Sequence, residues 1–329
     1  MLFAAFQSKT PPKTPPPSLA DRGSRLIARI GRSRFAPRLR RWGVNRASMK
    51  RVAIIGSGLG LSLAIGVGVI EAQVARVAVL GFHDIIDPNL ASERAPARDP
   101  EESDYTRQDF ERLLNTLVDQ NYWFLTAEEL YDYFAKPNPD PIPEEFKHRP
   151  RVAISIDDGY ASAHDHALKA AEKIQKRTGK TVKFIWFINP AFLGRMDTEL
   201  PRMTCQDLRA GFKAGFYDVQ SHTANHQDLT QLKPEAIQIE FKQARDQLVT
   251  CLGDLDQHRQ VARHVAYPFG TTNATVIKYA RRYHLSGYVY NSRILRVLPW
   301  RDRYRLSRLP VNGSMPVEKL KKWAAGWSL

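Results

Sequence analysis

Two adjacent carboxylates, Asp157 and Asp158, are the side chains of this sequence with the clearest potential for chemistry. They follow the apolar run 152–156, which is typical of a buried strand, and Gly159 marks a turn directly after them. Acids at the mouth of a buried strand are costly unless they bind a metal ion or transfer protons. Asp-Asp-Gly is also common in solvated turns, so this stretch alone leaves both interpretations open.

Two histidines, His222 and His226, follow another predicted strand at residues 217–221. Because they stand four positions apart, both imidazoles can face one metal ion. The chain has nine histidines, so a pair at this spacing is weak evidence by itself. Its position strengthens it, because the carboxyl ends of parallel strands share one face, where active sites collect. Two imidazoles and one carboxylate from that face would form a catalytic site for zinc or a similar divalent ion.

A turn follows a third predicted strand, in the segment Ala266 to Gly270. Its proline and glycine fix a turn whose backbone N–H groups can point inward. Such a donor can hold a developing oxyanion during acyl transfer. An ordinary strand-to-helix turn has the same composition, so the segment is informative only in combination with the other two.

The elements that must position these residues alternate between strands and helices over about 250 residues. This alternation predicts a parallel α/β fold, and the number of strands suits a barrel. Thr126 and Glu129 have the spacing of a capping box that opens a further helix. We predict strands at 77–82, 152–156, 182–188, 217–221, 264–267, 286–290 and 304–309, and helices at 106–119, 163–177, 204–214, 234–252 and 273–283.

The three segments, in this order, resemble the first three motifs of the NodB-type polysaccharide deacetylases, which are carbohydrate esterases of family four. The branch that acts on poly-N-acetylglucosamine is the most similar, and the resemblance spans about residues 77–312. It implies an irregular (β/α) barrel of about seven parallel strands. It also implies a metal-dependent hydrolase that removes N-acetyl groups from an N-acetylglucosamine-containing polysaccharide and releases acetate.

The resemblance assigns roles residue by residue. Asp157 matches the catalytic base, and Asp158 matches the aspartate that binds the metal. His222 and His226 match the two histidine ligands of the metal. Phe269 matches the residue whose backbone N–H binds the oxyanion. The implied metal is Zn²⁺, with Co²⁺, Ni²⁺ or Fe²⁺ as alternatives.

The sequence departs from the family pattern at the proton donor. It has neither the late Leu-x-His nor the Asp-x-x-Asp-Trp of many members, and Arg263 is offset from the usual arginine of the third motif. Arg308 is a candidate to replace that arginine and orient Asp157. His83 is a candidate to line the site or donate a proton, and a purely structural histidine fits equally well. The alternative function is therefore a catalytically weak carbohydrate-binding relative that keeps the metal site.

The net charge of +15 is concentrated at the N-terminus. Residues 1–51 hold 13 bases and one acid, whereas the remaining 278 residues hold 36 bases and 33 acids. Because the body is nearly neutral, the charge gives no support to nucleic-acid binding. Residues 1–48, rich in proline and arginine, are predicted to be a disordered basic arm.

Residues 49–74 are predicted to be a transmembrane anchor or a signal peptide. The 19 residues from 52 to 70 carry no charge and follow a basic pair, so both alternatives fit, and Met49 is a second candidate start. Either alternative places the domain at 75–329 outside the cytoplasm, anchored in the membrane or secreted, in the periplasm or at the cell surface. Glycines in this stretch imitate a dinucleotide-binding fingerprint, but Leu61 stands where its third glycine belongs. The expected partners are the polysaccharide and a membrane through residues 52–70, and the oligomeric state stays open.

Only two cysteines occur, Cys205 and Cys251, which excludes a zinc site made of thiolates. Cys251 lies on the apolar face of a predicted helix, so we expect a buried, inert thiol there. A disulfide between the two is a second possibility that the sequence does not decide. His164 and His166 fall early in another predicted helix, where we expect a solvated face.

Overall fold

The computed structural model describes residues 76–196, 200–296 and 302–327. The predictions for the basic arm at 1–48 and for the hydrophobic segment at 49–74 lie outside these residues. Among the helices of the described residues, none is both long and apolar enough to span a membrane.

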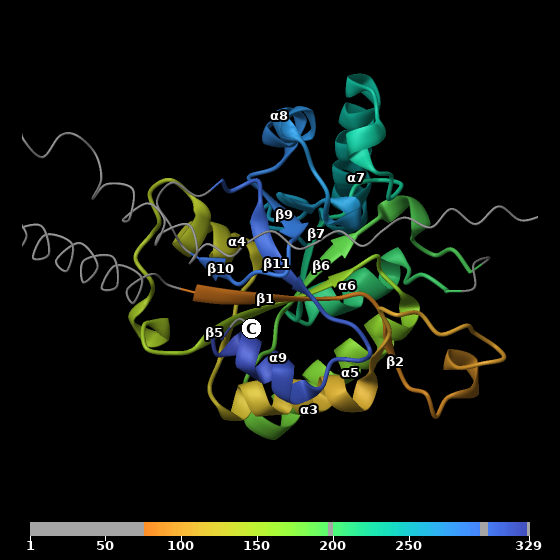
Figure 1. Cartoon of the computed structure of the whole chain (residues 1–329), viewed down its shortest axis with the longest axis vertical. Helices are drawn as coiled ribbons and strands as arrows, with labels where there is room; N and C mark the ends of the chain where they lie inside the picture. Colours follow the sequence, from red (N-terminus) through yellow and green to blue (C-terminus); the bar gives the residue numbers. More distant parts are fainter. Residues whose placement is uncertain (1–75, 197–199, 297–301, 328–329) are drawn as a thin grey trace, which may run out of the picture. The chain divides into compact units, whose positions relative to one another are not determined.

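Seven parallel strands close into a barrel (Figure 1). The ring closes because β1 has a parallel neighbour on each side, with Leu80 opposite Ile154 on one and opposite Leu309 on the other. The predicted barrel of about seven parallel strands is therefore confirmed. In order around the ring, the strands are β1 (Arg76–Phe82), β5 (Arg151–Asp157), β6 (Phe184–Ile188), β7 (Tyr217–Ser221), β8 (His264–Ala266), β9 (Ser286–Tyr290) and β11 (Leu306–Pro310).

Four shorter strands accompany the barrel. The strand β10 (Leu295–Arg296) runs antiparallel to β1, and β4 (Trp123–Phe124) runs parallel to β5. The strands β2 (Ile85–Ile86) and β3 (Tyr105–Thr106) pair with each other. None of the four was predicted, because two residues are too few to show an alternating pattern.

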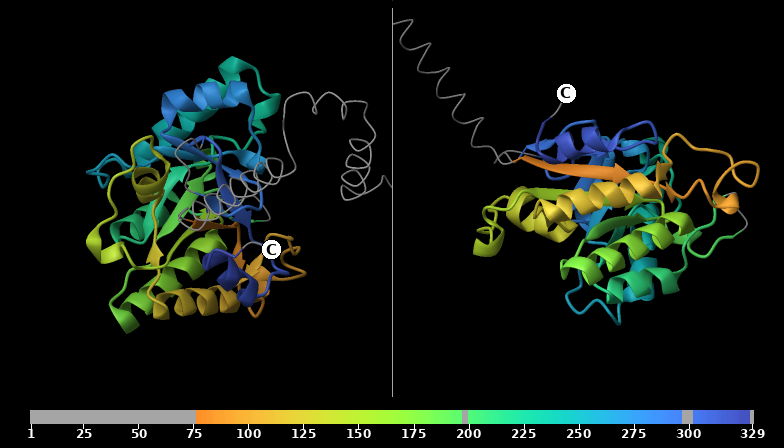
Figure 2. Two further views of the ribbon diagram at one scale, coloured as in Figure 1. Left: turned by 60° about the vertical axis from the view of Figure 1, so that its left-hand side comes forward. Right: turned by 90° about the horizontal axis from the view of Figure 1, so that it is seen from below.

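Helices cover the barrel on its outside (Figure 1). Both views of Figure 2 show α3 beside α5 and α9, whereas α7 and α8 pack against each other elsewhere on the barrel. The α-helices are α3 (Arg107–Asp119), α4 (Ala127–Leu130), α5 (Ala161–Thr178), α6 (Cys205–Lys213), α7 (Pro234–Leu252), α8 (Ala274–Tyr283) and α9 (Val317–Ala324). A π-turn lies at Tyr131–Ala135, and 3₁₀ turns lie at Ala91–Glu93, Glu144–Phe146, Pro190–Phe192, Leu229–Gln231 and Pro268–Gly270. The predicted capping box opens α4, since Thr126 and Glu129 each bond the other's backbone N–H.

Strand alternation explains how a hydrophobic strand delivers an acid to the site. Val152, Ile154 and Ile156 of β5 belong to the core between the strands and the outer helices. Ala153 belongs to a second core cluster with inward residues of the other strands. Because successive side chains of a strand point to opposite faces, Asp157 lies on the same face as Ala153, inside the barrel. The sequence therefore places this carboxylate at the rim of the barrel interior.

Two predictions about polar residues are wrong. Cys251 is not a free thiol, because it forms a disulfide with Cys205 that joins the end of α7 to the start of α6. His164 and His166 are buried. The barrel covers His164, and the loop after β2 covers His166. His164 Nδ1 lies 2.9 Å from the hydroxyl of Tyr217, and His166 Nε2 lies 2.9 Å from a carboxylate oxygen of Glu93.

Candidate active site and metal centre

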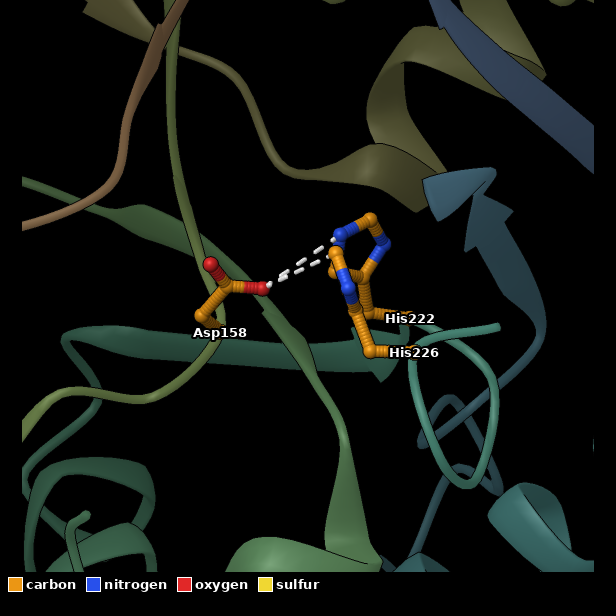
Figure 3. Close-up of side chains that lie close together, drawn as sticks. All are labelled: Asp158, His222 and His226. Carbon is orange, nitrogen blue, oxygen red and sulfur yellow. Dashed lines mark ion pairs between the residues drawn. The ribbon is translucent and has the colours of Figure 1, made fainter. Parts of the chain in front are cut away.

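Asp158, His222 and His226 come together at the carboxyl ends of β5 and β7 (Figure 3). Asp158 Oδ1 lies 3.6 Å from His222 Nε2 and 3.5 Å from His226 Nε2. Figure 3 shows the carboxylate facing both rings. Asp158 (φ 69°) and His226 (φ 52°) both have left-handed backbones, which are rare outside glycine and common at functional sites.

The loop that carries the two histidines is held from several sides. His222 Nδ1–H donates to the carbonyl of Ala266 at 2.8 Å, which leaves the Nε2 lone pair directed at Asp158. Asn189, just after β6, donates through its side-chain amide to the carbonyls of His222 and Thr223. Glu240 of α7 accepts from the backbone N–H and the side chain of Asn225, at 2.9 and 2.8 Å. These contacts fix the His222 ring and the backbone of the loop that carries His226.

The triad fits a divalent metal ion. Asp158 Oδ1 is buried and has no hydrogen-bond partner among the described residues, so a ligand is needed to satisfy it. Burial lowers the pKa of His222 to about 4, although Asp157 and Asp158 oppose the shift, so its imidazole is neutral near pH 7. Two atoms about 2.1 Å from a tetrahedral ion are roughly 3.4 Å apart. The observed separations of 3.5 and 3.6 Å agree with that geometry.

Asp157 lies beside the triad and is fully buried. Arg308 Nη1 donates to its Oδ1 at 2.6 Å, and the hydroxyl of Tyr290 donates to its Oδ2 at 3.1 Å. Its Oδ2 lies 3.9 Å from His222 Nε2. Burial raises the pKa of Asp157, but Arg308 and then His222 and His83 outweigh it and lower the pKa to about 2. The carboxylate is therefore ionised and able to accept a proton.

Arg308 is placed to orient Asp157, because its guanidinium contacts that carboxylate directly. Its guanidinium lies 3.9 Å from the centre of the Tyr290 ring and 5.0 Å from that of Phe187. Both rings restrict its rotation, and its Nη1 also donates to Ser155 Oγ at 3.3 Å. Arg263, by contrast, pairs with Glu128 at 2.9 Å and lies where β8 begins, away from Asp157.

The last two predicted residues also border the site. His83 follows β1, its ring centre lies 5.7 Å from that of Tyr290, and its Nδ1 is buried with no partner in the described part of the chain. Phe269 (φ 57°) forms the predicted turn. The residue is 64% exposed, and its ring centre lies 4.8 Å from that of His226. The turn therefore lies directly beside the triad.

Three residues that shape the site were not predicted from the sequence: Tyr290, Asn189 and Glu240. Tyr290 ends β9 and Asn189 follows β6 directly, so a search of every strand end would have found both. Glu240 gave no signal, because an acid in the middle of a long helix is ordinary.

Comparison with known proteins supports the sequence resemblance. A family model described as polysaccharide deacetylase matches residues 145–288, which include the triad, Asp157 and Phe269. A polysaccharide deacetylase from Bacillus cereus has a TM-score of 0.62 at 17% identity, covering 76% of this chain and 69% of that chain. No curated protein sequence matches this chain.

Two further solved structures share the fold. The Streptococcus pyogenes deacetylase PplD, solved in complex with acetate, has a TM-score of 0.59 at 21% identity, covering 76% of this chain and 98% of that one. IcaB from Ammonifex degensii has a TM-score of 0.57 at 20% identity, covering 76% of this chain and 97% of that one. The family model covers the residues of the site and these structures share the fold, so residues 145–288 form a domain of the polysaccharide deacetylase type, similar to the NodB-type deacetylases.

Proposed function

We propose that this chain removes N-acetyl groups from an N-acetylglucosamine-containing polysaccharide and releases acetate, with a divalent metal, Zn²⁺ first, at Asp158, His222 and His226. One observation carries the proposal. An ionised, buried carboxylate, that of Asp157, lies beside a triad whose ligand atoms converge within 4.8 Å. A base next to an open metal site is the arrangement that metal-assisted hydrolysis needs.

When bound, a divalent ion at this triad lowers the pKa of a water molecule and polarises the acetamide carbonyl. Asp157 then accepts the proton of the attacking water, and the water oxygen forms a bond to the carbonyl carbon. Arg308 and Tyr290 hold Asp157 in one orientation during this transfer. The backbone N–H of Phe269 is the proposed donor to the oxyanion.

The carbon–nitrogen bond breaks when the leaving amine receives a proton. His83 is the proposed donor, because its ring adjoins Tyr290, which bonds Asp157, and its buried Nδ1 has no partner in the described residues. The proton held by Asp157 can return to solvent or to His83, so acetate and amine leave with the atoms balanced.

Separate observations support the proposed polymer and the proposed compartment. Phe269 is 64% exposed beside the triad, so the site opens on the surface, as an extended polysaccharide requires. The resemblance to the poly-N-acetylglucosamine branch favours that polymer. The disulfide between Cys205 and Cys251 supports a location outside the cytoplasm, since such bonds persist in oxidising compartments. An anchor or signal at residues 52–70 would deliver the domain there.

A second candidate function is a carbohydrate-binding relative that keeps the metal but turns over slowly. The sequence favours it at one point, because the late Leu-x-His that supplies the usual proton donor is missing. This candidate predicts polymer binding without appreciable acetate release.

The test is acetate release by the full chain from poly-N-acetylglucosamine, chitin oligomers and peptidoglycan. We expect release from at least one polymer, loss with a chelator and recovery with Zn²⁺. Asp157→Asn should lower the rate more than about 100-fold while bound zinc is retained, because only the base is removed. Polymer binding without acetate release would favour the second function, and full activity after metal removal would contradict the first.

A further inference from the structure

A pocket of about 470 Å³ lies at the opposite end of the barrel from the triad, between the second half of α7, the end of α8 and the segment that leads into β8. Its volume is typical of small-ligand pockets, which span roughly 300–1,000 Å³. We call it the arginine pocket, because five of its lining residues are arginines: Arg245, Arg259, Arg263, Arg281 and Arg282.

The positive charge of this pocket is largely uncompensated. Asp256 is the one acid among the described residues that line it, and its two carboxylate oxygens accept the backbone N–H groups of residues 260 and 261, at 2.9 and 2.8 Å. Arg263 is neutralised by Glu128 at 2.9 Å. Within the described ranges, Arg245, Arg259 and Arg281 pair with no carboxylate. These three residues are exposed, so water weakens the repulsion between their guanidinium groups, and an anion bound between them would offset the rest.

Helix ends explain only part of this arrangement. Arg281 and Arg282 stand in the last turn of α8, where basic side chains interact favourably with the helix dipole. Arg282 also donates to Gln238 at 3.2 Å, and Arg281 lies 5.2 Å from the centre of the Tyr304 ring. The helix dipole and contacts of this kind do not explain Arg245, which lies more than one turn before the end of α7. They do not explain Arg259 either, which lies in the segment between α7 and β8.

We propose that the arginine pocket binds a phosphate group. The guanidinium fork matches two phosphate oxygens at once, which makes arginine the preferred side chain for this anion. A liquid water occupies about 30 Å³, so a pocket of about 470 Å³ holds a phosphate with part of its hydration shell. The phosphate can belong to a soluble phosphate ester or to a lipid headgroup. The site is separate from the catalytic residues and does not depend on the proposed reaction.

Calorimetric titration of inorganic phosphate into the full chain tests the site directly. The matched variants are Arg245→Gln/Arg259→Gln/Arg281→Gln in the pocket and Arg112→Gln/Lys169→Gln/Lys176→Gln on α3 and α5, which carry the same charge change. We expect the pocket variant to bind phosphate at least about tenfold more weakly, since each charge-assisted bond contributes substantially. The control variant should stay within about twofold of the original chain, because screening limits the effect of distant charges.

Vesicles identify the source of the phosphate. The original chain and both variants carry the same residues 52–70, so any difference in vesicle binding between them reports only the substituted side chains. If the ligand is a lipid headgroup, phosphatidylglycerol in phosphatidylcholine vesicles will increase binding of the original chain and the control more than of the pocket variant. If it is a soluble phosphate, calorimetry will separate the variants and the vesicles will not.

Two results would overturn the proposal: no phosphate binding by the original chain in either assay, or equal affinity for all three proteins. Far-UV circular dichroism and thermal unfolding establish that the pocket variant is folded. Its acetate release should equal that of the original chain, so a failure of this proposal is distinguishable from a failure of the proposed function.

Discussion

His264 and His222 are buried histidines at opposite ends of the same barrel, and their surroundings differ. Both ring nitrogens of His264 have partners where the strands begin, with Nδ1 2.8 Å from Ser286 Oγ and Nε2 3.0 Å from Glu128 Oε2. Where the strands end, His222 Nδ1 has the carbonyl of Ala266, but its Nε2 faces Asp158 Oδ1, which has no hydrogen-bond partner among the described residues.

The difference separates a group that holds the fold together from a group that awaits a ligand. A buried polar atom without a partner costs free energy, so it persists where a bound ion or substrate completes it. The cluster of His264 is already complete, and its role is structural. Where the strands begin, each barrel strand also has a basic residue at or shortly before its first residue: Arg76, Arg149, Lys183, Lys213, Arg263, Arg282 and Arg305.

Exchanging each of these two histidines for alanine should give the largest contrast. His222→Ala removes a metal ligand, so the affinity for zinc and the rate of acetate release should each fall more than about 100-fold. Loss of a residue that only orients a metal ligand usually costs less than that. His264→Ala leaves Glu128 with one partner fewer and should lower the free energy of unfolding by about 1–3 kcal/mol, with zinc retained. Metal analysis and chemical denaturation measure the two effects. Zinc bound at full stoichiometry by His222→Ala would contradict the division between the two ends.

Arg308→Gln should give the next largest effect, on both stability and pH dependence. Removing one partner of a buried ion pair costs about 3–5 kcal/mol, because Asp157 would remain buried without its cation. Arg308 depresses the pKa of Asp157, so its loss raises that pKa, and the acidic limb of the kcat/KM profile should move to higher pH.

The same ion pair sets the stability of the original chain in acid. A carboxyl group with a depressed folded-state pKa adds stability above its unfolded pKa of about 3.9 and loses it as the pH falls towards about 2. The matched control is Arg263→Gln, which breaks the pair with Glu128 at the other end of the barrel. That variant should leave the acidic limb of acetate release unchanged. An unshifted limb in Arg308→Gln would show that Asp157 is not the base.

Much of the fold was predictable from the sequence, because long strands and amphipathic helices carry a periodic signal. The strand 152–156 and the helix 106–119 were placed within about two residues of their observed bounds. The helix α9 and the two-residue strands were missed, since they are short or gain their stability from tertiary contacts. The burial of His164 and His166 was missed because a helix pattern does not reveal which loop will cover its polar face.

The site was predictable where residue types are distinctive and not where ordinary residues act by position. Asp158, His222 and His226 were identified from type, spacing and strand ends, and the structure brings them together. The side chains that aim them, Asn189 and Glu240, belong to elements distant in sequence, so no local pattern connects them. The pairing of Cys205 with Cys251 depends on how α6 and α7 pack, which spacing does not determine.

Tyr290→Phe should have the smallest effect at the catalytic end, and it isolates a single hydrogen bond. The substitution keeps the ring that stacks 3.9 Å from the guanidinium of Arg308 and removes only the hydroxyl that donates to Asp157. A donor to the charged form of an acid lowers its pKa, so the loss should raise the pKa of Asp157 and move the acidic limb upwards, by less than in Arg308→Gln. The expected loss in stability is about 1 kcal/mol.

Tyr288→Phe is the matched control, because Tyr288 lies two residues earlier on β9 and the tyrosine hydroxyl bonded to Asp157 is that of Tyr290. Its pH profile of acetate release should coincide with that of the original chain. If Tyr288→Phe and Tyr290→Phe shift the acidic limb equally, the shift reports a general loosening of the barrel. If only Tyr290→Phe shifts it, the hydroxyl acts through Asp157 and adds to the effect of Arg308 on that carboxylate.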